Sequence, residues 1–414
     1  MKKPELLVPA SSLEVLKVAV IFGADAVYIG GEVFGLRAKA KNFSKKDMEE
    51  GIAFAHDHNV KVYITANILA HNKDLEEIEE YFIELRELEP DALIISDPGA
   101  FMIAKKICPQ IEIHISTQAN NTNYGTYRFW HQLGAKRVVS ARELSLKEIA
   151  EIREHIPEEM EIETFIHGAM CISYSGRCLL SNYFTGRDAN QGACTHPCRW
   201  KYAVVEETRP GEYLPVYENE RGTYIFNSRD LCMIEHIPEL VEAGIDSFKI
   251  EGRMKTALYV AAVARTYRKA IDDFFCSREN YEKNMPWYRE QISNCTYRQF
   301  TTGFFFGKPD ETAQIYDNNT YVKEYTYLGI VGEKRTDGRY RIEQRNKFSV
   351  GEIIEVMKPN GENIEVTVRS IQDEENHEME SAPHPKQVLY IDLGQPLAKY
   401  DILRRQEKEE QADG

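Results

Sequence analysis

The feature that most constrains the fold of this 414-residue chain is a regular alternation of short apolar runs with amphipathic helical stretches. The runs lie at residues 5–8, 26–29, 61–65, 92–96, 111–116, 137–140, 161–166 and 247–250. Strands of a parallel sheet are covered by helices on both faces, so they form continuous apolar runs. Eight such strands with intervening helices predict an α/β fold, a closed (β/α)8 barrel of the TIM type.

The alternative that this pattern leaves open is a doubly wound parallel sheet. A dinucleotide-binding sheet of that class opens its first crossover with a G-x-G-x-x-G turn. The segment after the first run is PASSLEVLKV, which lacks this motif. We therefore favour the closed barrel.

Capping signals place the helices between these strands. In a capping box, a serine and an acidic residue three positions later satisfy backbone N–H groups at the start of a helix. The pairs with this spacing are Ser11 with Glu14, Ser44 with Asp47, and Ser145 with Glu148. Asp97 before Pro98 predicts another start, and Asp230 and Gly244 predict the two ends of the helix before the eighth strand.

The same patterns divide the chain into a large and a small domain. We assign residues 1–298 to the barrel, with an insertion at 170–228 where the interval between strands is abnormally long. Residues 299–320 form a connector, and 406–414 form an acidic tail. Residues 321–405 carry strand-like runs at 327–331, 340–344, 353–357, 364–371 and 388–392, which predict a small antiparallel β-barrel. Because small barrels bind nucleic acid on one face, Lys347, Arg404 and Arg405 are candidate phosphate contacts.

Charge and hydropathy narrow the classes of function. The net charge of −15 argues against binding nucleic acid over the whole surface but allows a local basic patch. No run approaches the roughly 18 apolar residues of a membrane span, so we expect no membrane partner. Lys2 and Lys3 precede an apolar stretch that Pro4, Glu5 and Glu14 interrupt. We therefore expect no signal peptide and a cytoplasmic protein.

Five of the eight cysteines lie between residues 171 and 232. In a reducing compartment, clustered cysteines indicate metal binding or catalysis rather than disulfides. The cluster lacks the tight C-x-x-C pairs that zinc knuckles use. The wide spacing of Cys171, Cys178, Cys194, Cys198 and Cys232 suits an iron–sulfur cluster, whose ligands come from separate loops. The alternative is a group of buried thiols without a metal.

Polar residues follow most of the predicted strands, at the end of a TIM barrel where active sites lie. We take His167, Glu251, Gln118 and Asn67 as candidate catalytic residues; a histidine in particular exchanges protons near neutral pH. The candidate cofactor-binding residues are Arg37, Arg253 and Arg142, because a guanidinium binds a carboxylate or phosphate with two hydrogen bonds. Each residue taken singly is explained equally well by a helix cap or a salt bridge.

Several motifs resemble the collagenase-like peptidase family, a family of U-type peptidases of unknown mechanism. The resemblance rests on PELLVPA, AVYIGG, FGLRAKAKNF, ETFIHGAMCISYSGRCLLSNY, RDANQGAC followed by PCRW, and KIEGRMK. These motifs span the whole barrel. The FTTGFFFG connector and the C-terminal β-domain are similar to the longer branch of the family.

The longer branch is implicated in prephenate-dependent hydroxylation of the wobble uridine of tRNA to 5-hydroxyuridine. The resemblance therefore implies a tRNA-modifying enzyme with tRNA and prephenate as partners and a shorter, barrel-only paralogue as a second subunit. Other members resemble paired iron–sulfur proteins that hydroxylate the ubiquinone ring without oxygen, in which four cysteines hold a four-iron, four-sulfur cluster. Carried over, Cys171, Cys178 and Cys194 match three of the ligands and Cys232 the fourth, with Cys198 as an extra thiol close by.

Two other classes of function remain open: a peptidase, as the family name says, and a non-enzymatic scaffold or partner subunit. The sequence has no Ser-His-Asp order, H-E-x-x-H zinc motif or P-loop, which weakens the case for a hydrolase. The colour of the protein purified without oxygen separates the classes. A brown protein favours a cluster, and a colourless zinc protein favours hydrolysis.

Overall fold

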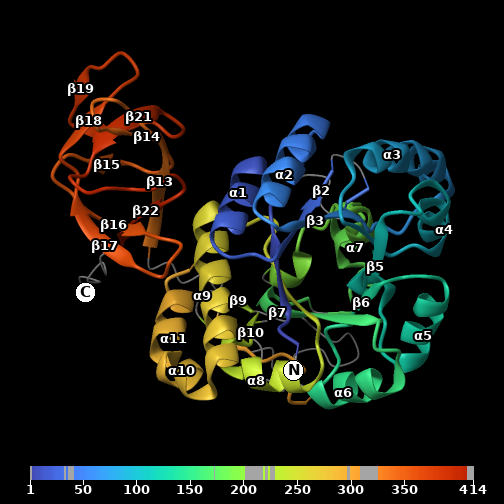
Figure 1. Ribbon diagram of the computed structural model, residues 1–414. Coiled ribbons are helices and arrows are strands. Elements are labelled where there is room, and N and C mark those ends of the chain that lie inside the picture. The colour runs from blue at the N-terminus through green and yellow to red at the C-terminus, as the bar shows by residue number, and fades with distance from the viewer. Residues whose placement is uncertain are drawn as a thin grey trace.

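The computed structural model describes residues 2–31, 34–35, 42–171, 173–200, 218–219, 222–223, 229–295, 299–307 and 325–407. These residues form a large α/β barrel and a smaller β-domain beside it (Figure 1). None of the helices in these ranges combines the length and the hydropathy that a bilayer crossing needs.

The large domain is the predicted barrel. Its strands are β1 (Glu5–Pro9), β2 (Ala26–Gly30), β3 (Lys61–Ala66), β4 (Ala92–Ile95), β5 (Glu112–Ile115), β6 (Arg137–Val139), β7 (Glu161–Ala169) and β11 (Ser247–Ile250). Each pairs in parallel with the next, and β11 closes the ring by pairing with both β7 and β1. The closed barrel is therefore confirmed, and all eight predicted runs are strands.

The helices form the outer layer, and their buried apolar residues belong to one cluster with those of the strands. They are α1 (Leu13–Ile21), α2 (Lys45–Asp57), α3 (Leu75–Leu88), α4 (Pro98–Ile107), α5 (Tyr124–Gln132), α6 (Leu146–His155), α8 (Ile237–Glu242), α9 (Ala257–Cys276), α10 (Arg278–Lys283) and α11 (Met285–Ser293). The capping boxes at the starts of α2 and α6 and the aspartate cap of α4 are confirmed. The first cap is wrong by one position: Ser12, rather than Ser11, accepts the N–H of Val15.

Asp230 is not a helix cap, contrary to the prediction. It begins strand β10 (Asp230–Cys232), which runs antiparallel to β7 and parallel to β12 (Phe300–Thr301). The reason is that β7 extends to Ala169, past its pairing with β11, and its free edge pairs with β10. Helix α8 starts only at Ile237, while Gly244 follows its end as predicted.

The C-terminal domain is an eight-stranded sheet whose pairs are all antiparallel, in the order β17-β16-β22-β13-β14-β21-β18-β19. The strands are β13 (Tyr325–Lys334), β14 (Tyr340–Gln344), β16 (Ile353–Met357), β17 (Asn363–Thr367), β18 (Ser370–Gln372), β19 (Glu378–Met379), β21 (Val388–Asp392) and β22 (Ile402–Gln406). The short pair β15 (Phe348–Ser349) and β20 (Ser381–Ala382) lies beside them. The domain encloses an apolar core of its own.

One predicted phosphate contact in this domain, Arg404, is wrong. Arg404 on β22 is fully buried, pairs with Glu355 and lies over the ring of Tyr325. A buried guanidinium committed to a carboxylate must break that pair before it binds a phosphate. Arg405 is partly exposed and pairs with Glu352 at 3.1 Å, a weak surface contact, so Arg405 and Lys347 stay predicted phosphate contacts.

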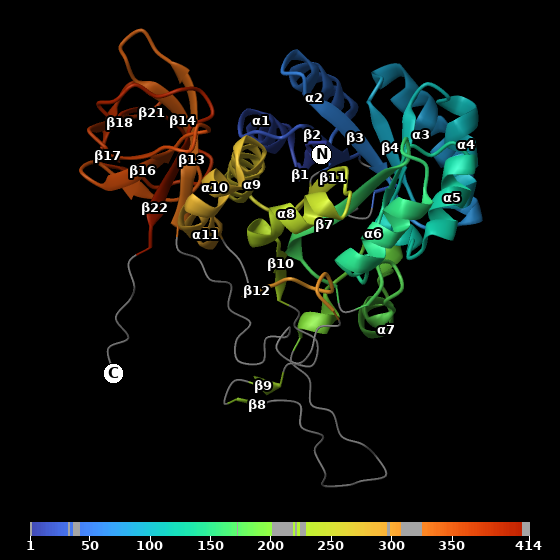
Figure 2. The same cartoon turned by 60° about the horizontal axis from the view of Figure 1, so that its bottom comes forward.

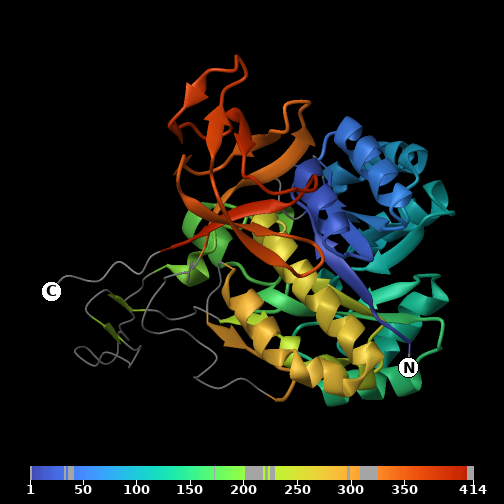
Figure 3. The same ribbon diagram turned by 60° about the vertical axis from the view of Figure 1, so that its left-hand side comes forward.

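The β-domain packs against α9 of the barrel (Figure 3). Met357 and Ile402 belong to the same apolar cluster as the barrel. Arg265, which is 2% exposed, reaches from α9 to the carbonyl of Lys358 at 2.8 Å and to Asn363 Oδ1 at 3.0 Å. This interface holds the two domains together through apolar packing and a buried, hydrogen-bonded cation.

Candidate functional site

A cysteine-bearing insertion lies over the C-terminal ends of the barrel strands. It follows β7 and contains helix α7 (Leu180–Thr185) and the 3₁₀ turns Ala189–Gln191 and Pro197–Arg199. Asn120 Nδ2 donates to the carbonyl of Ser175 at 3.1 Å, and Gln191 Nε2 donates to that of Leu69 at 2.6 Å. Figure 1 shows α7 inside the ring of outer helices, and Figure 2 shows it beyond one end of the barrel. The insertion therefore covers the mouth, where a TIM barrel places its chemistry.

Arg142 follows β6 and is held in the mouth by Glu251, which follows β11. Arg142 Nη1 donates to the carbonyl of Ala169 at 2.6 Å, and Nη2 lies 3.3 Å from Glu251 Oε2. The guanidinium stacks on Phe165, 3.8 Å from the ring centroid. Arg142 Nε is buried and has no acceptor among the described residues. An anion bound here would compete with Glu251 for Nη2 of Arg142 and would accept a hydrogen bond from Nε.

Arg253 crosses the mouth from the loop after β11 to β3. It is 8% exposed, and its Nη1 donates to Thr65 Oγ1 at 2.7 Å. A Cβ at Gly30 would lie 2.6 Å from this nitrogen, so a larger residue at the end of β2 would displace the guanidinium. Arg37, the third predicted cation, lies outside the described residues.

His167 on β7 is buried beside Cys232 on β10 and linked to it by Tyr267 of α9. The Tyr267 hydroxyl donates to the carbonyl of Ile166 and accepts the N–H of Met233, both at 3.1 Å. It also lies 3.3 Å from His167 Nδ1 and 3.8 Å from Cys232 Sγ. Burial lowers the pKa of His167 to about 3 and raises the pKa of the Cys232 thiol to about 11. The imidazole of His167 is therefore neutral near pH 7 and lies outside the range in which an acid–base catalyst works best.

Asn67 and Gln118 lie on the opposite side of the mouth, after β3 and β5. Asn67 Nδ2 donates to Ser116 Oγ at 3.2 Å. Among the described residues, neither Asn67 Oδ1 nor Gln118 Oε1 meets a hydrogen-bond donor, although both oxygens are buried. Leaving a buried acceptor without a hydrogen bond costs free energy. These two amide oxygens are therefore available to accept hydrogen bonds from a molecule bound in the mouth.

The insertion brings four of the cysteines to the mouth as thiols rather than disulfides. Cys171 and Cys194 are exposed, Cys178 and Cys198 are half-buried, and the N–H of His196 donates to Cys194 Sγ at 3.4 Å. In the described part of the chain, no three cysteine sulfurs lie within 4.8 Å of one another. A single zinc ion with ligands at about 2.3 Å needs that spacing. A cluster binds each thiolate at a different iron, so it allows wider separations.

Cys232 is half-buried and lies on strand β10, apart from the loop that carries the other four thiols. Cys232 pairs with His167 across the β7–β10 ladder. His167 lies four residues before Cys171 in the sequence. Cys198 lies in the same loop as Cys194, in the turn Pro197–Arg199. The structure thus places the two candidates for the fourth ligand on different elements.

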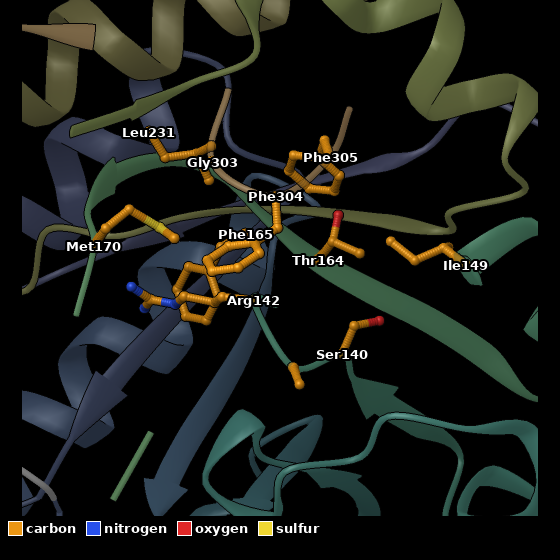
Figure 4. A pocket seen from close by; sticks show the side chains of 11 residues that line it. Ser140, Arg142, Ile149, Thr164, Phe165, Met170, Leu231, Gly303, Phe304 and Phe305 are labelled. Atoms are coloured by element: carbon orange, nitrogen blue, oxygen red, sulfur yellow. The ribbon is translucent and has the colours of Figure 1, made fainter. Parts of the chain in front are cut away.

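The segment Phe300–Gly307 closes one side of the mouth, a role that the sequence reasoning did not assign to it. Figure 4 shows a small pocket beside Arg142, walled by Phe165, Met170, Phe304 and Phe305. The N–H of Leu146 donates to the carbonyl of Phe305 at 3.0 Å, which fixes the segment to the start of α6. The run of aromatics in FTTGFFFG was the available signal.

Comparison with known proteins extends over the whole chain. The model of peptidase family U32 matches residues 11–315, and that of the peptidase family U32 C-terminal domain matches residues 323–404. The tRNA hydroxylation protein P1 of Bacillus subtilis is 40% identical over 98% of this chain and 95% of its own length. The tRNA hydroxylation protein P of Escherichia coli is 38% identical over 98% of this chain and 97% of its own length. The tRNA hydroxylation protein P2 of B. subtilis is 38% identical over 74% of this chain and 98% of its own length.

Proposed function

We propose that this chain, which belongs to peptidase family U32, hydroxylates tRNA, converting the wobble uridine to 5-hydroxyuridine with prephenate as co-substrate. The observation that carries the proposal is the similarity to tRNA hydroxylation proteins over 98% of the chain. That likeness includes the barrel, the cysteine insertion and the C-terminal domain together. It is therefore more specific than a shared barrel, which hosts many unrelated activities.

We further propose that the insertion holds a four-iron, four-sulfur cluster through Cys171, Cys178, Cys194 and Cys232, with Cys198 as the alternative fourth ligand. What supports such a group is the donor chemistry: the insertion and β10 bring five thiols, none in a disulfide, to one region of the described chain. A backbone N–H donated to sulfur, as at Cys194, also stabilises a cluster-bound thiolate. When bound, a cluster of this kind supplies one-electron redox chemistry.

The arginines of the mouth are the proposed site for prephenate, which carries two carboxylates. Arg253 and Arg142 project from the loops after β11 and β6, and Arg37 completes the proposed set. Arg142 is partly neutralised by Glu251. We expect the co-substrate to depend most on Arg37 and Arg253, with Arg142 as the third cation.

A second subunit is part of the proposal. Two of the relatives come from B. subtilis, and the shorter one, protein P2, matches 74% of this chain with 98% of its own length. A shorter protein of this kind is the expected partner. Binding of the two purified chains, measured by size-exclusion chromatography, tests for the pair.

The proposed function is tested by deleting the gene and measuring the wobble uridines of total tRNA by mass spectrometry. We expect 5-hydroxyuridine and nucleosides derived from it to disappear and to return when the gene is supplied on a plasmid. Unchanged modification in the deletion strain, with no second homologue present, contradicts the proposal. Release of peptides from gelatin by the purified protein would instead support the peptidase reading of the family name.

A further inference from the structure

The insertion exposes a group of large apolar side chains that the proposed chemistry does not use. We call it the insertion aromatic patch; its aromatic members are Tyr174, Tyr183, Phe184 and Trp200, with exposed fractions of 45, 81, 44 and 41%. Leu179 lies between them in sequence and is 72% exposed. Isolated exposed apolar residues are common, but a gathering on one short segment marks an interaction surface.

Helix α7 buries a polar residue and exposes aromatic residues, the reverse of an ordinary amphipathic helix. Its small polar residue Ser181 is buried, where Ser181 Oγ accepts the N–H of Thr195 at 3.1 Å. Its aromatic residues Tyr183 and Phe184 face outward. A helix that folds only for stability buries its large apolar residues, so this orientation indicates that the aromatic face serves a partner.

Three of the rings contact one another. Tyr183 and Phe184 lie 5.1 Å apart between ring centroids in an edge-to-face arrangement, and Phe184 and Trp200 lie 6.0 Å apart. Figure 2 shows α7 beyond the end of the barrel, on the side where the mouth opens. The patch therefore lies next to the mouth, within reach of a molecule that also enters it.

The charge of this segment is opposite to that of the whole chain. The chain carries a net charge of −15, but residues 171–200 contain three arginines and a single acidic residue. Arg177 and Arg187 are exposed on either side of the aromatic residues of α7. The acidic residue, Asp188, accepts a hydrogen bond from Asn182. The combination of exposed rings and cations fits a partner with flat aromatic groups and negative charge.

We propose that the insertion aromatic patch binds unpaired bases of the RNA substrate by stacking, while Arg177 and Arg187 contact the adjoining phosphates. This proposal rests on the proposed function, since it names how the tRNA is held. In a duplex the base faces are covered by their neighbours, so only an unpaired loop offers them to protein side chains. Stacking on aromatic rings and contacts of arginine with the backbone are the two interactions that bind single-stranded RNA.

Binding of a short, unpaired RNA oligonucleotide to the full-length protein tests the proposal. Tyr183→Ala and Phe184→Ala should each weaken binding about tenfold. Tyr183→Phe should keep wild-type affinity, and Tyr183→Leu should lose it as the alanine variant does, because leucine is apolar but does not stack. The matched control is Phe129→Ala on α5, a residue with 51% exposure outside the insertion, which should leave affinity unchanged.

Trp200 supplies a direct optical readout. Of the three tryptophans, Trp130 is 6% exposed and Trp287 packs against the barrel core, whereas Trp200 is open to solvent. Stacking of a base should quench its fluorescence, and Trp200→Phe should abolish the quenching while keeping the affinity. Arg177→Ala combined with Arg187→Ala should flatten the dependence of affinity on salt concentration.

The outcomes separate this proposal from the proposed function. If the wild-type protein restores tRNA hydroxylation in cells but the Tyr183→Ala/Phe184→Ala variant binds RNA as tightly as wild type, stacking on the patch is wrong and the function stands. If hydroxylation is absent but the patch variants still lose RNA affinity, the patch is an RNA site and the function is wrong. Unaltered RNA affinity together with loss of binding to a second protein chain would make the patch a protein interface and overturn the proposal.

Discussion

We predict that Gly176, in the SGRC motif of the insertion, lets the cysteine loop pack against the mouth, because a side chain at this position would collide with Gln118. Its φ of +71° is a left-handed conformation, and a Cβ would lie 2.0 Å from Gln118 Oε1. Gly186, ten residues later, has a similar φ of +64° but no atom within 4 Å of such a Cβ. The two glycines therefore share the conformational constraint and differ in the contact with Gln118.

The expected costs follow from this difference. Alanine in a left-handed conformation costs about 1–2 kcal/mol, and both Gly176→Ala and Gly186→Ala incur that cost. Gly176→Ala also displaces the Gln118 amide, and overpacking of this kind costs about 1–3 kcal/mol. Since the amide is the end of a flexible side chain, we expect the lower half of that range. At 1.4 kcal/mol per factor of ten, local opening should rise roughly tenfold further in Gly176→Ala than in Gly186→Ala.

Hydrogen exchange measured by mass spectrometry on peptides covering residues 173–186 reports this opening, because exchange follows the local free energy. Amides such as that of Arg177, which donates to the carbonyl of Tyr174, should exchange faster in Gly176→Ala. Adding Gln118→Ala should remove the excess over Gly186→Ala. Equal acceleration in the two glycine variants, or no rescue by Gln118→Ala, would refute the reasoning.

Burial alone would raise the pKa of Glu5, but the guanidinium of Arg137 on β6, 2.6 Å from the carboxylate, outweighs it and holds the pKa at about 2, below the ordinary 4.5. The ion pair stabilises the folded protein by roughly 3 kcal/mol above about pH 4.5, and this stabilisation is lost as the pH falls toward 2. Between these pH values, the melting temperature of the wild type should therefore fall more steeply than the melting temperature of Glu5→Gln. Identical pH dependence of the melting temperature in the two proteins would contradict a stabilising ion pair between Glu5 and Arg137. The Cys171→Ala/Cys178→Ala protein, purified without oxygen, should lose its iron; full retention by elemental analysis excludes this ligand set. Arg37→Ala/Arg253→Ala should raise the prephenate requirement at least tenfold, more than it unfolds the protein, and unaltered hydroxylation excludes this pocket.

The barrel was predictable from the sequence because its determinants are local. Continuous apolar runs, capping pairs such as Ser44 with Asp47, and the Asp97–Pro98 start each act within a few residues. Asp230 shows the limit of this reasoning. An aspartate before an apolar run has the same local pattern whether it caps a helix or begins a strand. Asp230 begins a strand because β10 pairs with the free edge of β7, about 60 residues earlier in the sequence.

The site was predictable in location but not in its connections. Strand ends identified Arg142, Glu251 and Arg253, since a barrel gathers these ends at one mouth. That Arg142 pairs with Glu251 depends on strands distant in sequence. Tyr267 was missed because it lies in the middle of α9, where an aromatic residue at helical spacing is indistinguishable from ordinary core. The burial of Arg404 was missed for the same reason: no local signal separates a paired cation from a surface one.

The central claim is that this chain hydroxylates tRNA through the cysteine insertion over the barrel mouth. Its most direct test is the amount of 5-hydroxyuridine-derived nucleoside at the wobble position in the deletion strain complemented with either of two genes. Wild type should restore the modification fully. Cys171→Ala/Cys178→Ala, shown to be folded by its melting temperature, should leave the wobble uridine unmodified. Full modification by that variant would contradict the claim.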